Sequence, residues 1–258
     1  MKQGSLSVVG TGYRIAAQVT PESLFQIQSA EKLFYVVADA ATELWLQQLN
    51  PTAESLHDAY AVGKPRIKTY REMVRRILTP VRQGERVCVA FYGHPGIFAY
   101  STHEAVKRAR KEGFRAAMLP GISALDCLFA DLGVDPSEGC QIFDATRFVT
   151  SRQKVDKACA LILWQVGAVG VSAYKTESMW STAGLELLRE ALAKTYPPKH
   201  KVVLYEAPYF PVCDPLIQHV PLAHLQRAKV TIASTLYVPP AASPRWDSRM
   251  AARLGLDS

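Results

Sequence analysis

Short apolar runs alternate with amphipathic segments along the first half of this chain. The apolar runs, which predict β-strands, cover residues 6–10, 32–38, 86–92 and 114–119. The segments between them predict helices, with start signals at Thr20-Pro21, Thr42, Thr69 and Thr102. Alternation of strands and helices in this order predicts an α/β fold with an open, mostly parallel sheet.

The pattern changes after residue 120. Helices are predicted at 123–132 and 182–194, and strand-like runs cover 141–149, 158–166, 202–206 and 230–237. This order of elements predicts a mixed α+β domain. We therefore expect two domains, residues 1–120 and residues 121–258, with the boundary near Pro120-Gly121 and a ligand cleft between the two.

Composition places the chain among ordinary globular proteins. Its 258 residues are 48% hydrophobic and 21% charged, which is enough for sizeable cores. The N-terminus lacks the apolar run of a signal peptide, no uncharged stretch is long enough to span a membrane, and the five cysteines form no CxxC or Cys/His cluster. We expect a cytoplasmic protein with reduced thiols, no structural zinc and no membrane association.

The motifs of several enzyme classes are missing. The sequence contains no GxxxxGK[ST], HExxH or GxSxG, so nucleotide hydrolysis, zinc proteolysis and serine hydrolysis have no support. Gly10-Thr11-Gly12 follows a predicted strand, but Ile15 stands where the dinucleotide fingerprint has its third glycine. A plain glycine-rich turn is the favoured interpretation of that segment.

The formal net charge is +7, and the excess is local. Eight basic residues and two acidic ones lie between Lys64 and Arg86. Such a stripe is typical of a solvated helix face, and it also fits contact with nucleic acid or with an acidic peptide. Few aromatic residues interleave with it, which weakens the nucleic-acid interpretation.

Two glycine turns follow predicted strands of the first half. They are Tyr92-Gly93-His94-Pro95-Gly96-Ile97 and Leu119-Pro120-Gly121-Ile122-Ser123-Ala124. Ligands of parallel sheets bind at the carboxyl ends of strands, where glycine lets the backbone come close to them. A plain tight turn explains the first segment nearly as well, and capping of the next helix is the favoured role for the Ser123 hydroxyl.

Together with Trp164-Gln165-Val166-Gly167, these turns make the chain resemble the tetrapyrrole (corrin/porphyrin) methylases over about residues 6–239. That family normally has Gly-Asp-Pro where this chain has Gly93-His94-Pro95. In this respect the chain resembles a subgroup of the family, the borosin peptide α-N-methyltransferases. The Tyr-Gly-His-Pro-Gly, Pro-Gly-Ile-Ser-Ala and Trp-Gln-Val-Gly motifs of that subgroup are all present.

The resemblance implies a two-domain fold that binds S-adenosyl-L-methionine in the interdomain cleft and releases S-adenosyl-L-homocysteine, with no metal. It also implies cofactor contacts from nine residues. These are Tyr92, His94, Ile97, Ser123, Ala124, Gln165, Ala207, Ser234 and Thr235.

The same resemblance assigns catalysis to Tyr60, Arg66 and Tyr70, which keep the subgroup's Tyr-x5-Arg-x3-Tyr spacing. The residues give some independent support. A capping box from Thr69 to Glu72 predicts that Tyr70 lies in the first helical turn, and the apolar stripe predicts that its ring points inward. On spacing alone, an ordinary core tyrosine beside a surface arginine is the simpler interpretation.

The resemblance thus predicts N-methylation of backbone amides in a ribosomally made precursor peptide. Residues 241–258 are too polar to be a methylated core, so we expect a separate precursor, a homodimer and, with two precursors bound, a heterotetramer. A methyltransferase of the same fold acting on a tetrapyrrole or on ribosomal RNA is one alternative. A catalytically silent scaffold that binds peptide or RNA is another. The role of His57 stays open.

Overall fold

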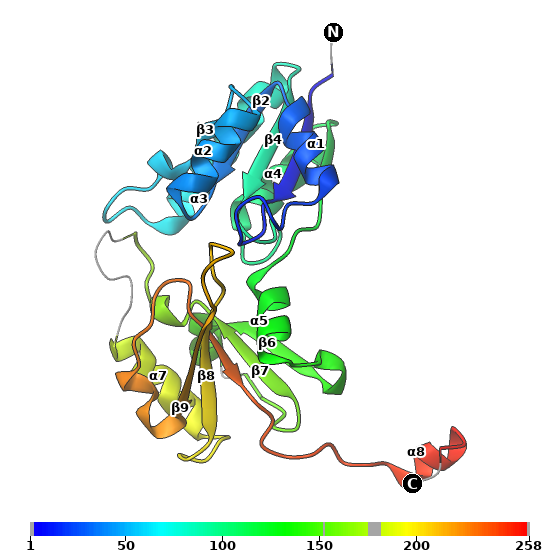
Figure 1. Cartoon of the computed structure of the whole chain (residues 1–258), viewed down its shortest axis with the longest axis vertical. Helices are drawn as coiled ribbons and strands as arrows, with labels where there is room; N and C mark the ends of the chain where they lie inside the picture. The colour runs from blue at the N-terminus through cyan, green and yellow to red at the C-terminus, as the bar shows by residue number, and fades with distance from the viewer. Residues whose placement is uncertain (1–2, 152, 175–181, 257–258) are drawn as a thin grey trace. The chain divides into compact units, whose positions relative to one another are not determined.

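A computed structural model describes residues 3–151, 153–174 and 182–256, and its chain forms two compact units. The first unit consists of the residues up to Val134 together with residues 171–174 and 206–216, which return to it later in the chain. The second unit holds most of the other residues. Each unit contains one five-stranded sheet (Figure 1). No helix among the described residues is both long and apolar enough to span a bilayer.

The chain passes from the first unit to the second between Val134 and Asp135, which is later than the predicted boundary at Pro120-Gly121. The helix α5 (Ala124–Leu132) lies between these two points. A contact ties this helix to the start of the chain, because the Gln18 amide nitrogen lies 3.6 Å from the Cys127 sulfur. The helix is therefore part of the first unit by packing.

The sheet of the first unit is parallel throughout, with strand order β3-β2-β4-β1-β5. Its strands are β1 (Ser5–Gly10), β2 (Lys32–Val36), β3 (Glu54–Ser55), β4 (Arg86–Phe91) and β5 (Arg115–Met118). This confirms the parallel α/β sheet predicted for the first half. Strand β4 is a continuous apolar run because it is buried on both faces.

Two helices cover each face of this sheet. The first face is packed by α3 (Arg66–Arg82) and α4 (Tyr100–Lys111), and the other by α1 (Pro21–Ser29) and α2 (Ala40–Leu49). Alternate residues of a strand point to opposite faces, so Val89 packs toward α3 while Cys88 packs toward α1 and α2.

Three of the predicted helix starts are wrong. Helix α4 begins at Tyr100, two residues before the predicted start at Thr102, whose hydroxyl donates to backbone carbonyls and does not cap the helix. Helix α2 begins at Ala40 because the Asp39 carboxylate, rather than Thr42, caps it. Helix α3 begins at Arg66, a full turn before Thr69, and it continues through Pro80 to Arg82. The Thr69 hydroxyl is buried inside this helix and has no hydrogen-bond partner among the described residues, so the predicted capping box does not form. Burial of Ile77, Leu78 and Val81 holds the helix together around the proline.

The sheet of the second unit is mixed, with order β6-β7-β10-β8-β9. The strands are β6 (Cys140–Asp144), β7 (Ala160–Trp164), β8 (Lys201–Glu206), β9 (Leu216–Pro221) and β10 (Thr235–Val238). The helices are α6 (Ala145–Thr150), α7 (Thr182–Ala193) and α8 (Ser248–Arg253). The mixed α+β prediction is confirmed.

Three details of the second half differ from the prediction. The run 141–149 is not one strand, because Asp144 ends β6 and caps α6. The run 230–237 becomes a strand only at Thr235. Strand β9 was not expected, because most of its side chains are exposed and it lacks an apolar pattern. Short 3-10 helices cover His57–Ala59, Pro136–Glu138, Val166–Ala168 and Leu222–Arg227.

Candidate functional site

Arg66 and Tyr70 form a hydrogen-bonded pair at the start of α3. Arg66 Nε donates to the Tyr70 hydroxyl oxygen at 3.0 Å, and its guanidinium carbon lies 5.9 Å from the centre of the Tyr70 ring. The four-residue spacing puts both side chains on one side of the helix. The Tyr70 ring is half-buried and packs against the first unit's core, as predicted.

The predicted position of Tyr70 within its helix is wrong. Tyr70 is the fifth residue of α3, beyond the first turn. The positive end of the helix dipole acts mainly within that turn. The cation that contacts the Tyr70 oxygen is therefore the Arg66 side chain, and the helix terminus contributes little.

Tyr60 lies beside this pair. The rings of Tyr60 and Tyr70 meet edge to face, with centres 6.5 Å apart. Burial raises the pKa of Tyr60 well above its ordinary value, and the neighbouring Tyr70, which Tyr60 hydrogen-bonds, raises it further. Tyr60 therefore keeps its proton at neutral pH and acts as a hydrogen-bond donor.

Two further tyrosines complete an aromatic cluster that the sequence did not reveal. Tyr100, the first residue of α4, lies 6.2 Å from Tyr70 between ring centres. Tyr174 lies 5.1 Å from Tyr60. The four tyrosines, Tyr60, Tyr70, Tyr100 and Tyr174, surround the polar contact between Arg66 and Tyr70, and we call them the tyrosine cluster.

A segment from far along the chain holds the start of α3 in place. The backbone N–H of Arg66 donates to the Ser172 carbonyl at 3.1 Å, and Tyr174 N–H donates to the Lys64 carbonyl, also at 3.1 Å. These bonds satisfy an amide of the first helical turn that has no partner inside the helix. Pairing between residues about a hundred positions apart leaves no local signal in a sequence.

His57 is tied to the structure on one side. Its Nε2 lies 2.6 Å from the Val37 carbonyl oxygen, and its ring centre lies 6.1 Å from that of Tyr60. The contact with Val37 fixes the imidazole against the end of β2. This histidine therefore supports the wall behind Tyr60.

The glycine turns come together at the carboxyl ends of β4 and β1. A Cβ at Gly10 would lie 2.3 Å from the Gly93 carbonyl oxygen and 3.1 Å from the Gly121 Cα, so no other residue fits there. Gly93 has a φ of +67°, a conformation that glycine adopts at little cost. The three backbones pack directly on one another, as the two predicted turns require.

The turn from Tyr92 to Ile97 closes on His94. Gly96 N–H donates to His94 Nδ1 at 2.9 Å, which places the ring proton of a neutral imidazole on Nε2. Ile97 N–H donates to the His94 carbonyl at 3.3 Å. His94 is thus held in one orientation with a donor directed away from the turn.

Ser123 caps α5, as expected. Its hydroxyl accepts from Leu125 N–H and Asp126 N–H and donates to the Asp126 carboxylate, while Asp126 accepts from Ser123 N–H. The hydroxyl is committed to this capping box. Ala124, the next residue, is buried.

The segment that carries Ala207 also returns to the first unit. Ala207 is buried, and two residues later the Tyr209 carbonyl accepts a hydrogen bond from Ile15 N–H at 3.2 Å. The Tyr209 ring stacks on Tyr13, which meets Tyr92 edge to face at 6.0 Å. A tyrosine group of Tyr13, Tyr92 and Tyr209 thus lies beside the glycine turns.

The remaining candidates, Gln165, Ser234 and Thr235, belong to the second unit, where β7 ends and β10 begins. Gln165 has a φ of +57°, which is unusual for a residue with a side chain. The next residue, Val166, donates its N–H to the Ser234 carbonyl at 3.3 Å. The structure therefore gathers these three, with Ser234 and Thr235 fully buried.

Among the described residues, no three His, Cys, Asp or Glu side chains gather into a group that could hold a metal ion. The candidate side chains at the glycine turns are tyrosine, histidine, isoleucine, serine and alanine, and the nearby Asp126 carboxylate is held in the capping box with Ser123. This end of the sheet offers neutral polar and aromatic groups to a ligand.

Comparison with known proteins places the chain in a family. Residues 5–208 match the family described as Tetrapyrrole (Corrin/Porphyrin) Methylases, and the chain belongs to that family. The fold agrees with a solved structure, a uroporphyrin-III-C-methyltransferase from Thermus thermophilus, with a TM-score of 0.66 over 99% of this chain and 98% of the other. That protein shares 15% sequence identity, which shows the fold alone.

Two curated relatives share a much higher sequence identity with this chain. A methyltransferase/ribosomally synthesized cyclic peptide gymnopeptides precursor from Gymnopus fusipes is 40% identical over 92% of this chain and 57% of its own length. A methyltransferase/ribosomally synthesized type I borosin cyclic peptide precursor from Serendipita vermifera subsp. bescii is 39% identical over 99% of this chain and 63% of its own length. The chain thus spans about three fifths of these relatives.

Proposed function

We propose that this protein is an S-adenosyl-L-methionine-dependent methyltransferase that methylates backbone amide nitrogens of a peptide. The observation that carries the proposal is the Arg66–Tyr70 pair inside the tyrosine cluster, where a proton acceptor and a fixed cation lie side by side. Relatives named as methyltransferase and cyclic peptide precursor support a peptide substrate.

The residues near the glycine turns suit this cofactor. S-adenosyl-L-methionine carries an adenosine and a sulfonium but no phosphate, and the residues that would hold it in the first unit include no lysine or arginine: Tyr92, His94, Ile97, Ser123, Ala124 and Ala207. Gln165, Ser234 and Thr235 of the second unit complete the proposed set. When bound, the cofactor supplies an electrophilic methyl group.

A backbone amide nitrogen is a poor nucleophile because its lone pair is delocalised into the carbonyl group. In the proposed mechanism, Tyr70 acts as a phenolate and takes the N–H proton, so that the nitrogen gains an available electron pair. Arg66 donates to the amide oxygen and stabilises the negative charge that develops there. Arg66 Nε already holds the Tyr70 oxygen at 3.0 Å, which positions both groups together.

Tyr60 plays a supporting part in this proposal. Its raised pKa keeps it protonated, so it donates a hydrogen bond to Tyr70 rather than competing as the base. Tyr60 therefore orients the phenolate and Tyr70 carries the proton.

Gln165 provides a prediction that separates backbone strain from cofactor binding. Gln165→Gly relieves the cost of a left-handed backbone at a residue with a side chain, so we expect the free energy of unfolding to rise by about 1 kcal/mol. Loss of the side chain should weaken cofactor affinity about 10-fold. Thermal denaturation and calorimetric titration measure the two effects.

Gln165→Ala is the matched control, because it removes the side chain and leaves the backbone strain in place. It should show the weaker cofactor binding without the gain in stability. Unchanged cofactor affinity in both variants would remove Gln165 from the binding site.

Mass spectrometry tests the proposed function. Purified protein is incubated with trideuteromethyl-labelled cofactor and with apolar peptides encoded beside its own reading frame, and the products are fragmented. The proposal predicts labelled methyl groups on backbone nitrogens. Label on a tetrapyrrole or on ribosomal RNA, or no binding of the cofactor at all, would refute it. The separate precursor, the homodimer and the cytoplasmic location stay predictions.

A further inference from the structure

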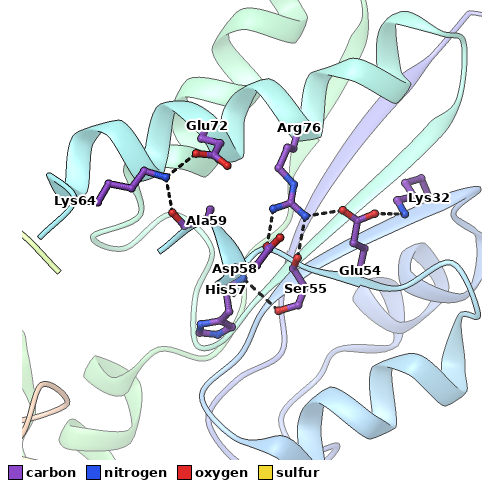
Figure 2. A network of polar contacts seen from close by, with 9 residues as sticks. All are labelled: Lys32, Glu54, Ser55, His57, Asp58, Ala59, Lys64, Glu72 and Arg76. Atoms are coloured by element: carbon purple, nitrogen blue, oxygen red, sulfur yellow. Dashed lines mark hydrogen bonds and ion pairs between the residues drawn. The ribbon is translucent and has the colours of Figure 1, made fainter. Parts of the chain in front are cut away.

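The basic stretch from Lys64 to Arg86 divides into paired and unpaired side chains. Figure 2 shows part of the paired group: Lys64 Nζ lies 2.6 Å from a Glu72 oxygen, and Arg76 bridges Asp58 and Glu54 at 2.6 Å each. The Arg76 guanidinium also donates to the Ser55 carbonyl. These cations tie α3 to the short strand β3 and to the loop after it.

Two more cations of the stretch are paired near the end of α3. Arg82 forms a two-pronged contact with Glu112, each N–O distance being 2.7 Å, and Arg86 lies 3.9 Å from a Glu31 oxygen. Arg66 belongs to the Tyr70 site. The basic residues that remain are Lys68, Arg71 and Arg75, which are exposed and form no ion pair with other described residues.

The three unpaired cations share one side of α3. Their spacing of three and four residues repeats the turn of the helix. The neighbouring helix α4 adds two exposed lysines, Lys107 and Lys111. We call these five residues, Lys68, Arg71, Arg75, Lys107 and Lys111, the α3–α4 basic face.

Helices α3 and α4 pack against each other over the same core, and Glu104 of α4 lies among the charges of both. The pKa of its carboxyl group lies below the ordinary value, chiefly because Arg108 hydrogen-bonds it, with smaller contributions from the positive charges of Lys107 and Arg71. Arg71 of α3 therefore acts on a residue of α4. Because Glu104 is paired with Arg108 at 2.6 Å, it does not neutralise the five cations.

We propose that the α3–α4 basic face docks an acidic segment of the peptide substrate, an inference that rests on the proposed function. The face points outward, on the side of α3 opposite to the side chains of Arg66 and Tyr70, although Lys68 and Arg71 are close to Tyr70 along the chain. An acidic segment docked there leaves the reacting side of the helix to another part of the same peptide. The distance from Lys68 to Arg75 is about 10 Å, the length of about three extended residues.

An acidic peptide suits this surface better than nucleic acid does. Proteins that bind single strands combine cations with exposed aromatic platforms. Tyr70 is the only aromatic residue between Lys68 and Arg75, and it packs against the core. Opposite charge on a docking segment raises the rate of encounter and makes it depend on salt.

The test measures binding of three fluorescent probes by anisotropy. The probes are a peptide of alternating glutamate and alanine, the same peptide with glutamine in place of glutamate, and a single-stranded RNA of similar length. The variant is the triple substitution Lys68→Gln, Arg71→Gln and Arg75→Gln. The matched control is Lys194→Gln, Lys199→Gln and Lys229→Gln, which removes three equally exposed cations of the second unit.

We expect the acidic peptide to bind the unaltered protein and the control alike, and the triple variant about 10-fold more weakly. Added salt should weaken the binding, and the glutamine peptide should not bind. Lys107→Gln with Lys111→Gln repeats the test on α4. Equal weakening in the control, tighter binding of RNA than of the acidic peptide, or no binding of the acidic peptide would overturn the proposal.

These outcomes are independent of methyl transfer, because the probes contain no acceptor core. Docking without methylation of any peptide would count against the proposed function and leave the basic face standing. Methylation that proceeds equally well with acidic and uncharged flanking segments would overturn the docking role and leave the proposed function standing.

Discussion

Tyr70→Phe should reduce methyl transfer by a factor on the order of 100 or more, with cofactor binding unchanged. The ring packs against the core of the first unit and keeps that packing as phenylalanine, so only the hydroxyl is lost. Without that oxygen, the amide proton has no acceptor beside Arg66. Single-turnover rates and calorimetric titration of the cofactor measure the two quantities.

Tyr100→Phe is the matched control for this variant. Its ring lies 6.2 Å from that of Tyr70, but its hydroxyl has no part in the proposed proton transfer. We expect this variant to retain most of the activity. Turnover near the original rate in Tyr70→Phe would exclude Tyr70 as the base, and equal losses in both variants would point to a role for the aromatic walls alone.

Arg66→Lys should lower the rate of transfer about 10- to 100-fold although it keeps the charge. The planar guanidinium contacts the Tyr70 oxygen through Nε and carries its other N–H donors in the same plane. A lysine ammonium is a compact point charge on a flexible stem and cannot hold both oxygens in a fixed geometry. The loss should appear in kcat, since the contact develops fully only as charge builds on the amide.

Arg82→Lys makes the same change at an exposed position near the end of the same helix, outside the α3–α4 basic face. It should leave kcat unaltered, which separates geometry at Arg66 from a general effect of replacing arginine. Full activity in Arg66→Lys would show that positive charge alone suffices and would contradict the proposed two-oxygen contact.

Strands and glycine turns were the most predictable parts of the fold. Strand β4 lies between two neighbours in the sheet and is covered on both faces from Val87 to Phe91, so those residues must be apolar. The two glycine turns were predictable because their backbones pack too closely for side chains: a Cβ at Gly121 of the second turn would lie 3.0 Å from the carbonyl oxygen of Gly93 in the first. The inward face of α3 followed from its apolar spacing, which places Met73, Val74 and Ile77 in the core.

The start of α3 was not predictable from local signals. Thr69 and Glu72 have the spacing of a capping box, but the helix begins one turn earlier because Ser172 supplies a carbonyl to the Arg66 amide. Tyr174 reaches Tyr60 through the same distant segment. Contacts between residues so far apart in the sequence depend on tertiary structure. Strand β9, whose side chains are mostly exposed, likewise forms through its place in the sheet and not through a local apolar pattern.

The sequence alone also does not show which cations of the basic stretch have acidic partners. Eight basic residues look alike in the sequence, yet Lys64, Arg76, Arg82 and Arg86 contact acidic partners that lie up to 55 positions away. Only the structure shows which cations are left over. The surface available to a partner is therefore smaller than the sequence indicates.

The most direct test of the account is a crystal structure of the protein with S-adenosyl-L-homocysteine and a bound peptide. The central claim predicts that the Tyr70 oxygen lies about 2.6–3.2 Å from the acceptor amide nitrogen, with Arg66 donating to the carbonyl oxygen of the same peptide bond. A peptide whose acceptor nitrogen lies beside another basic group and beyond hydrogen-bonding distance of Tyr70 would contradict it.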